Sequence, residues 1–264
     1  MTTNSSFIEK YINIDYNAVE KKITTFIADA VINSNLNGLV IGLSGGIDSS
    51  VVLELACKTL PRHNILGLIM PYDGITPQND IDDALAIAKD KGIDYRVIPI
   101  NSIHDSFMKD LVNDKIASGN LNARIRMSLL YYHANLMNRL VIGTGDKSEI
   151  KLGYYTKYGD GGIDLLPIGD LYKLQIRKLA THMKIKSEII NKKSSPQLWK
   201  NHSAEDEIGL SYELIDSVLV CIEESIDTKE ISNILNIEKK LVDKIVKMID
   251  KSHHKKILPE ICEI

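Results

Sequence analysis

A turn rich in serine and glycine, placed between an apolar run and a helical pattern, constrains this chain more than any other stretch. Residues 38–43 read Gly-Leu-Val-Ile-Gly-Leu, the turn is Ser44-Gly45-Gly46, and apolar residues recur at helical spacing from Ile47 to Ala56. This pattern predicts a buried strand, an anion-binding turn and a helix. Glycines let a ligand approach the backbone closely, and the free N–H groups of the first helical turn favour a phosphate there.

Two common phosphate-binding motifs do not describe this turn. It lacks the lysine of the Gly-x-x-x-x-Gly-Lys loop, and it lacks the Gly-x-Gly-x-x-Gly of dinucleotide-binding folds. Asp48 stands in the first helical turn, where a carboxylate either favours the helix dipole or holds a cation that bridges phosphate oxygens. A glycine-rich turn without any ligand is the structural alternative.

Further strands and helices alternate along the chain. Apolar runs at residues 64–70, 95–100 and 140–143 predict three more strands, and helical patterns lie between them at residues 81–88, 103–112 and 122–138. Such alternation predicts an α/β fold: a three-layer, doubly wound parallel sheet with ligands at the carboxyl ends of its strands. We expect one more short strand near Leu165.

Helices are expected at both ends of the chain. Asp15 can cap a helix with one apolar face, made of Ala18, Val19, Ile23, Phe26, Ile27, Ala30 and Val31. Residues 1–14 are expected to be peripheral. Helical periodicity also covers residues 171–183 and 211–251, and 264 residues suit a single domain.

Composition excludes several functional classes. The chain has 32 Lys and Arg residues against 35 Asp and Glu residues, a formal net charge of −3, so we expect no nucleic-acid partner. Three separated cysteines without a Cys-x-x-Cys pair argue against a disulfide framework and a structural zinc site. No run is long enough to span a membrane and the N-terminus lacks a signal pattern, so we expect no membrane association and a cytoplasmic location.

Two polar segments show no regular periodicity. Residues 153–167 combine aromatic, glycine and charged residues, which is typical of either a plain surface loop or a binding loop. Residues 192–207, which contain Ser194-Ser195-Pro196, are expected to form a mobile polar loop.

The turn resembles the Ser-Gly-Gly-x-Asp-Ser pyrophosphate loop of the N-type ATP pyrophosphatases, which split ATP into AMP and pyrophosphate. Four later segments, at residues 122–127, 143–149, 156–162 and 254–256, occur in the order found in NAD synthetases. Over residues 15–260 the chain closely resembles the ammonia-dependent form of that family, and several motifs in order are more specific than any one alone.

The resemblance implies a ligase that amidates deamido-NAD (nicotinic acid adenine dinucleotide) with ammonia, using ATP and Mg²⁺, through an adenylate, to give NAD, AMP and pyrophosphate. It implies an adenine nucleotide alpha hydrolase-like, Rossmann-like fold with C-terminal helices, and a homodimer. Glutamine-dependent members carry an added amidase domain, for which we expect no room here. Residues 1–264 would then form one NAD synthetase domain, with a separate glutaminase as one source of ammonia.

The resemblance also implies roles for individual residues. Asp48, Lys173 and Thr144 are implied to be catalytic, and Asp48 and Glu149 to bind Mg²⁺. Residues implied to bind ATP are Gly42, Leu43, Ser44, Gly45, Gly46, Ile47, Asp48, Ser49, Thr144, Lys173 and Ser195. Residues implied to bind deamido-NAD are Arg124, Lys157, Asp164, His254 and Lys255.

Two features depart from the family pattern. Ser195 stands where threonine is common, which keeps the hydroxyl and loses a methyl group. Lys147, beside Asp146, changes the charge near the implied metal ligand Glu149. Taken singly, Arg124, Lys173 and Glu149 are also typical of solvated helix residues, as the basic tail around His254 is typical of an ordinary surface.

Other functions remain open on the sequence. The first loop alone also suits GMP synthetase, asparagine synthetase or a tRNA-modifying thiolase, although the thiolase would need a reactive cysteine and a basic RNA surface. A non-catalytic sensor of adenine nucleotides is an alternative of another class. It predicts ATP binding without turnover and leaves residues 154–164 unexplained.

Overall fold

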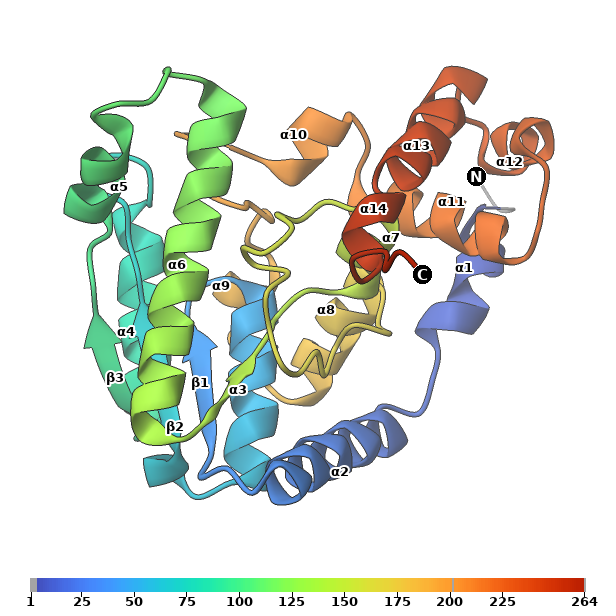
Figure 1. The fold of residues 1–264 in the computed structure, drawn as a ribbon. Coiled ribbons are helices and arrows are strands. Elements are labelled where there is room, and N and C mark those ends of the chain that lie inside the picture. Colours follow the sequence, from blue (N-terminus) through green and yellow to red (C-terminus); the bar gives the residue numbers. More distant parts are fainter. Residues whose placement is uncertain (1–3, 201, 264) are drawn as a thin grey trace.

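A parallel sheet of four strands forms the centre of the molecule. The computed structural model describes residues 4–200 and 202–263. The strands lie in the order β3-β2-β1-β4 (Figure 1), with β1 at Leu39–Gly42, β2 at Ile65–Ile69, β3 at Asp94–Val97 and β4 at Leu140–Ile142. Leu39 is in register with both Ile65 and Leu140. The predicted α/β class and parallel sheet are confirmed.

The expected additional strand is reduced to one residue pair. Leu165 forms an isolated parallel bridge with Ile142, and the Gly143 amide donates to the Leu165 carbonyl at 2.7 Å. β3 ends at Val97, earlier than predicted. Pro99 follows, and because proline has no N–H group it cannot extend the ladder.

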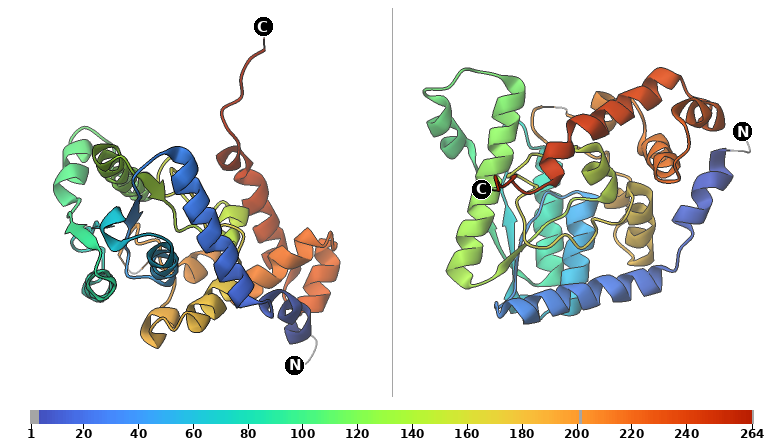
Figure 2. Two further views of the ribbon diagram at one scale, coloured as in Figure 1. Left: turned by 90° about the horizontal axis from the view of Figure 1, so that it is seen from below. Right: turned by 45° about the vertical axis from the view of Figure 1, so that its right-hand side comes forward.

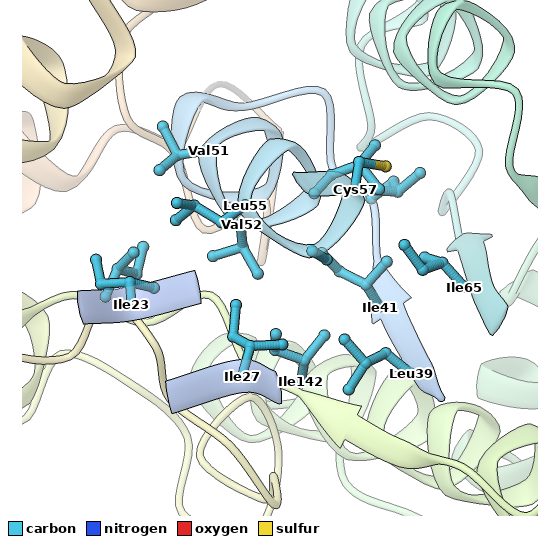
Figure 3. Packing of buried hydrophobic residues seen from close by; sticks show 14 of the residues in the cluster. Ile23, Ile27, Leu39, Ile41, Val51, Val52, Leu55, Cys57, Ile65 and Ile142 are labelled. Atoms are coloured by element: carbon cyan, nitrogen blue, oxygen red, sulfur yellow. The ribbon is translucent and has the colours of Figure 1, made fainter. Parts of the chain in front are cut away.

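Helices cover both faces of the sheet, which makes three layers. Leu39 and Ile41 face one apolar cluster while Val40 between them faces another, as alternation along a strand requires. The first cluster (Figure 3) packs on α2 (Tyr16–Ser34), α3 (Ile47–Thr59), α4 (Gln78–Lys91) and α8 (Lys173–His182). The second packs on α5 (Asn101–Met108) and α6 (Lys115–Met137).

Helix boundaries partly follow the sequence signals. Asp15 caps α2 as predicted, accepting from the amides of Asn17 and Ala18 at 3.0 and 3.2 Å. The expected apolar face of α2 was wrong at Ala18, which is exposed, and at Phe26, which is 47% exposed. α6 begins seven residues before the predicted start at Asn122, because Asp114 caps it through the Ala117 amide at 2.7 Å.

The C-terminal helices build a second core beside the sheet domain (Figure 2). They are α11 (Tyr212–Glu223), α12 (Thr228–Leu235), α13 (Lys239–Lys251) and α14 (His253–Lys256). The first helix, α1 (Asn4–Ile12), lies at the rim of this core, and Gln175 Nε2 donates to the Tyr11 carbonyl at 2.7 Å. Short helices α7 (Lys147–Leu152), α9 (Ser187–Ile190) and α10 (Ala204–Ile208), with the 3-10 turn Arg62–Asn64, complete the fold. No helix among the described residues has the length and apolar character to cross a membrane.

Candidate active site

A cavity of about 680 Å³ opens at the carboxyl ends of the strands. The segments that border it include the predicted phosphate loop (residues 42–49), the segment after β2, the helix α6, the loop at residues 153–163 and residues 192–199. Residues 192–200 are here called the lid segment. Thr144, which follows β4, also borders the cavity. The cavity therefore lies where the sheet topology predicts a ligand.

The phosphate loop has the strand-turn-helix form that the sequence predicts. Gly45 adopts a φ of +74°, and a Cβ atom there would lie 2.1 Å from the Asp80 carbonyl oxygen, so glycine is required. Gly46 is the N-cap of α3 and offers no side-chain cap. The first-turn N–H groups of α3 are therefore left for a ligand at the positive end of the helix dipole.

A buried ammonium group lies directly behind this loop. Lys173 Nζ is 2.8 and 2.9 Å from the two carboxylate oxygens of Asp48, 2.7 Å from Asp146 Oδ2 and 3.7 Å from Glu149 Oε1. The Lys173 side chain is fully buried. Burial disfavours its charge, but the three carboxylates outweigh that effect and hold the pKa of Lys173 well above its ordinary value.

Helix starts bring these charges together. Lys173 is the first residue of α8 and Asp48 lies in the first turn of α3. Asp146 caps α7 and forms a capping box with Glu149, accepting from the Glu149 amide at 2.7 Å. Burial raises the pKa of both Asp146 and Glu149, against the lowering effect of Lys173. The group holds three carboxylates against one ammonium, so a further cation is electrostatically favoured.

Asp216, on α11, holds the start of α8 in place. Its Oδ2 accepts from the Leu174 amide at 2.9 Å, and its Oδ1 accepts from the Ser148 hydroxyl at 2.5 Å. The same hydroxyl accepts from the Lys173 amide at 3.0 Å. Burial raises the pKa of Asp216 to about 7. The C-terminal core thus contacts the backbone that carries Lys173.

The lid segment is tied across the phosphate loop. Lys192 Nζ donates to the Gly45 carbonyl at 2.9 Å, to Asp80 Oδ1 at 2.8 Å and to Asp83. Gln197 Nε2 donates to the other oxygen of Asp80 at 2.6 Å. Ser195 borders the cavity between these two contacts. The end of the predicted polar loop is helical, since α10 begins at Ala204.

The residues implied to bind deamido-NAD lie mostly outside the cavity wall. Lys255 borders the cavity and donates to the carbonyls of Gly153 and Tyr155, both at 2.7 Å. The Lys157 ammonium group donates to the His254 carbonyl at 2.5 Å. The Arg124 guanidinium group donates to the Lys157 carbonyl at 3.3 Å. These contacts gather four of the five residues around residues 153–157.

Asp164 stands apart from that group. Its carboxylate accepts from the Tyr131 hydroxyl at 2.8 Å and from the Val141 amide at 2.7 Å, at the edge of β4. Lys147, which was expected to change the charge near Glu149, pairs instead with Glu223 at 3.1 Å and Asp170 at 3.4 Å. Its charge is therefore directed away from the cluster of Asp146, Glu149 and Lys173.

Sequence reasoning missed Asp146, Asp216, Lys192 and Arg126. Asp146 follows the predicted strand at residues 140–143 and precedes Glu149 by three residues, which is the spacing of a capping box and was a usable signal. Asp216, Lys192 and Arg126 lie in ordinary helical or loop contexts. Their partners are distant in the sequence, so no local pattern reveals them.

Comparison with known proteins identifies similar chains. A profile of the family described as NAD synthase matches residues 19–259. The NH(3)-dependent NAD(+) synthetase of Staphylothermus marinus is 46% identical over 258 residues, which cover 96% of this chain and 94% of that protein. That of Archaeoglobus fulgidus is 42% identical and covers 95% of this chain and 98% of its own length.

Two solved structures share the fold over nearly their whole length. The NMN synthetase of Francisella tularensis aligns with a TM-score of 0.84 at 32% identity, covering 96% of this chain and 100% of that one. The NH3-dependent NAD synthetase of Campylobacter jejuni aligns with a TM-score of 0.79 at 35% identity, covering 95% and 100%.

Proposed function

The chain belongs to the NAD synthase family, and we propose that it amidates deamido-NAD with ammonia at the expense of ATP, giving NAD, AMP and pyrophosphate. The observation that carries this proposal is the phosphate loop, which opens on the same cavity as Asp48, Glu149 and the loop at residues 153–163. The names of the curated relatives favour ammonia as the nitrogen source.

The chemistry explains why ATP is needed. A nicotinate carboxylate is a poor electrophile because its negative charge is delocalised and an oxide would have to leave. Attack of this carboxylate on the α-phosphorus of ATP expels pyrophosphate and forms an acyl-adenylate. Ammonia then adds to the activated carbonyl and expels AMP. No protein nucleophile is required, so the protein contributes positioning and electrostatics.

The ATP phosphates would lie against the loop at residues 42–49 and the first turn of α3. The free N–H groups and the helix dipole stabilise negative charge there. Lys173 adds a fixed positive charge behind Asp48, with Thr144 on the β4 side of the cavity and Ser195 on the lid segment. The loop, Thr144 and Ser195 would contact the leaving pyrophosphate as the α-phosphorus is attacked, and the fully buried Lys173 would act through Asp48.

Asp48 and Glu149 fit a Mg²⁺ site. Both border the cavity, both offer carboxylate oxygens, which Mg²⁺ prefers, and the surrounding group has an excess of negative charge. A bound Mg²⁺ supplies neutralisation of charge on the phosphate oxygens. Lys173 holds both oxygens of Asp48 and so fixes the orientation of that carboxylate toward the loop.

The acceptor would bind beside residues 153–157. Hydrogen bonds to backbone carbonyls hold several positively charged side chains near this loop. The residues that these bonds join to the loop are Arg124, Lys157, His254 and Lys255. These charges suit the phosphates of a dinucleotide. Asp164 is proposed as a further contact from the β4 edge.

The lid segment would exclude water from the adenylate. An acyl-adenylate reacts with water as well as with ammonia, so the yield of amide depends on a closed cavity. Lys192 and Gln197 hold the lid segment to Asp80 across the phosphate loop. This arrangement supports a closed cavity during the adenylation step.

A second candidate acceptor is the corresponding mononucleotide. It is favoured by one observation: the NMN synthetase of Francisella tularensis aligns with a TM-score of 0.84. The adenylation chemistry would be the same, and only the second nucleotide of the acceptor would be absent. Comparison of the two acceptors in one assay decides between them.

We further propose that the protein works in the cytoplasm as a homodimer with the acceptor near the subunit interface, and that a separate glutaminase can supply ammonia. These proposals rest on the family resemblance and on the names of the relatives. Sedimentation velocity of the purified protein tests the dimer. A single species at the monomer mass at micromolar concentration would contradict it.

One assay tests the reaction. Purified protein is incubated with ATP, Mg²⁺ and deamido-NAD, with either ammonium or glutamine, and NAD, AMP and pyrophosphate are followed; parallel reactions contain the mononucleotide acceptor. We expect the three products in equal amounts with ammonium and none with glutamine. ATP binding without release of AMP would favour the nucleotide sensor instead.

A further inference from the structure

Arg126 borders the cavity, while Arg124 on the same helix does not. Residues two apart on an α-helix lie about 200° apart around its axis, so their side chains leave on nearly opposite sides. Arg124 is exposed and contacts the Lys157 carbonyl. Arg126 borders the cavity, where its Nε donates to the Met70 carbonyl at 3.0 Å. This contact fixes the guanidinium group at the end of β2.

Among the described residues, no carboxylate oxygen lies within 4.0 Å of a guanidinium nitrogen of Arg126, so Arg126 forms no ion pair there. Its one hydrogen bond to another residue uses Nε, so both terminal nitrogens remain available to the cavity. Burial lowers the pKa of Arg126 to about 10, opposed by the charge of Asp160, and the group stays protonated at neutral pH. Lys173 and Lys192, by contrast, are neutralised by carboxylates.

The charge of Asp160 acts on Arg126, but the two side chains form no ion pair among the described residues. A positive charge in a cavity wall without an ion-pair partner is costly for the folded protein. Such a group is explained when a ligand supplies the missing negative charge. The planar guanidinium group offers two parallel N–H donors, a geometry that matches two oxygens of a carboxylate or a phosphate. The Arg126 side chain therefore has the position, the charge and the free donors for an oxyanion.

We propose that Arg126 binds an oxyanion of the substrates through its two terminal nitrogens. This inference rests on the proposed function and adds a residue to its site. Two substrate groups share the required chemistry: a phosphate of ATP and the anionic groups of the acceptor, its carboxylate included. Separate binding measurements with ATP and with deamido-NAD distinguish these sources.

The test compares Arg126→Met with a matched variant elsewhere. Arg139 is also buried, with a pKa lowered by burial, and donates one hydrogen bond to a carbonyl, that of His63, at 2.7 Å. It precedes β4, at the opposite edge of the sheet from the cavity, and does not border the cavity. Isothermal calorimetry would measure the affinity for ATP and for deamido-NAD separately, in wild type and in both variants.

We expect Arg126→Met to weaken the binding of one of the two ligands by about 10- to 150-fold, the range for a hydrogen bond between charged groups. Arg139→Met should leave both affinities within about twofold. The melting temperature of Arg126→Met without ligand should stay the same or rise, since an uncompensated charge is removed. Arg126→Lys, which keeps the charge and loses the paired donors, should weaken the same ligand to a smaller extent.

Unchanged affinity for both ligands in Arg126→Met would overturn the proposal, as would an equal loss in Arg139→Met. If Arg126→Met does not fold, Arg126→Lys decides by the same criterion. The affinities need no turnover, so they remain informative if the wild type makes no NAD. In that case the proposed function fails while the role of Arg126 in ligand binding is judged separately.

Discussion

The ammonium nitrogen of Lys173 contacts both carboxylate oxygens of Asp48, at 2.8 and 2.9 Å, across 125 residues of sequence. The pair joins the first turn of α8 to the first turn of α3, directly behind the phosphate loop. Because Asp146 and Glu149 share the same ammonium, removal of Lys173 leaves three carboxylates without a counter-charge. Stability and activity should therefore both depend on this one side chain.

Lys173→Met should reduce NAD formation by at least about 100-fold and lower the free energy of unfolding by about 3–5 kcal/mol at pH 8. The pKa values of Asp146 and Glu149, already raised by burial, should rise further. Groups with a raised folded-state pKa add stability at low pH that is lost as the pH rises. Urea unfolding at pH 5 and pH 8 should thus show a smaller deficit at pH 5. An equal deficit at both values would contradict this account.

Asp216 should make stability depend on pH near neutrality. Its pKa is raised to about 7 from an ordinary value of 3.8, so its contribution is complete below about pH 4 and is lost as the pH rises toward 7. Asp216→Asn cannot lose a proton. Relative to this variant, wild type should lose up to about 1.4 kcal/mol of unfolding free energy per pH unit between pH 5 and 7. Parallel curves for the two proteins would show that Asp216 keeps an ordinary pKa.

Loss of the lid contact should uncouple the two half-reactions. Lys192→Met removes the bonds to Asp80, Asp83 and the Gly45 carbonyl, and water should then reach the adenylate. We expect AMP to exceed NAD by about twofold or more at low ammonium, because hydrolysis competes with amidation. Lys200→Met, an exposed lysine on the same lid segment, should keep the ratio at one. A ratio of one in Lys192→Met would refute the contribution of this contact.

Gly45→Ala should damage the phosphate loop. The φ of +74° is unfavourable for alanine, and its Cβ would lie 2.1 Å from a backbone oxygen of Asp80. We expect a loss of about 2–4 kcal/mol in unfolding free energy and weaker ATP binding. The control is Gly92→Ala: φ is +64° but the new Cβ would meet nothing within 4 Å, so only about 1–2 kcal/mol should be lost. Equal losses in the two variants would show that the contact with Asp80 is unimportant.

Local signals predicted the sheet and the strand-turn-helix form of residues 38–56 well. The strand at Leu39, the turn at Gly45 and the cap at Asp15 are each encoded within a few residues, and each is present in the structure. The start of α6 was missed because its first two turns, from Lys115, carry few apolar residues, and the Asp114 cap went unrecognised.

The contacts between side chains of different helices in the site could not be predicted in the same way. The Lys173 environment joins α3, α7 and α8, and no periodicity in one segment reports the charges on another. Likewise, the choice between Arg124 and Arg126 as a cavity residue depends on the rotation of α6 about its axis. That rotation is set by packing on the sheet, which local sequence patterns do not describe.

Lys255 of α14 bears on the order in which parts of the fold can form during synthesis. Lys255 holds the carbonyls of Gly153 and Tyr155 from 102 and 100 residues further along the chain, and Lys157 holds His254 across 97 residues. A ribosome exposes the sheet and the phosphate loop long before it exposes α14. The loop at residues 153–157 can therefore gain these contacts only after α14 has left the ribosome.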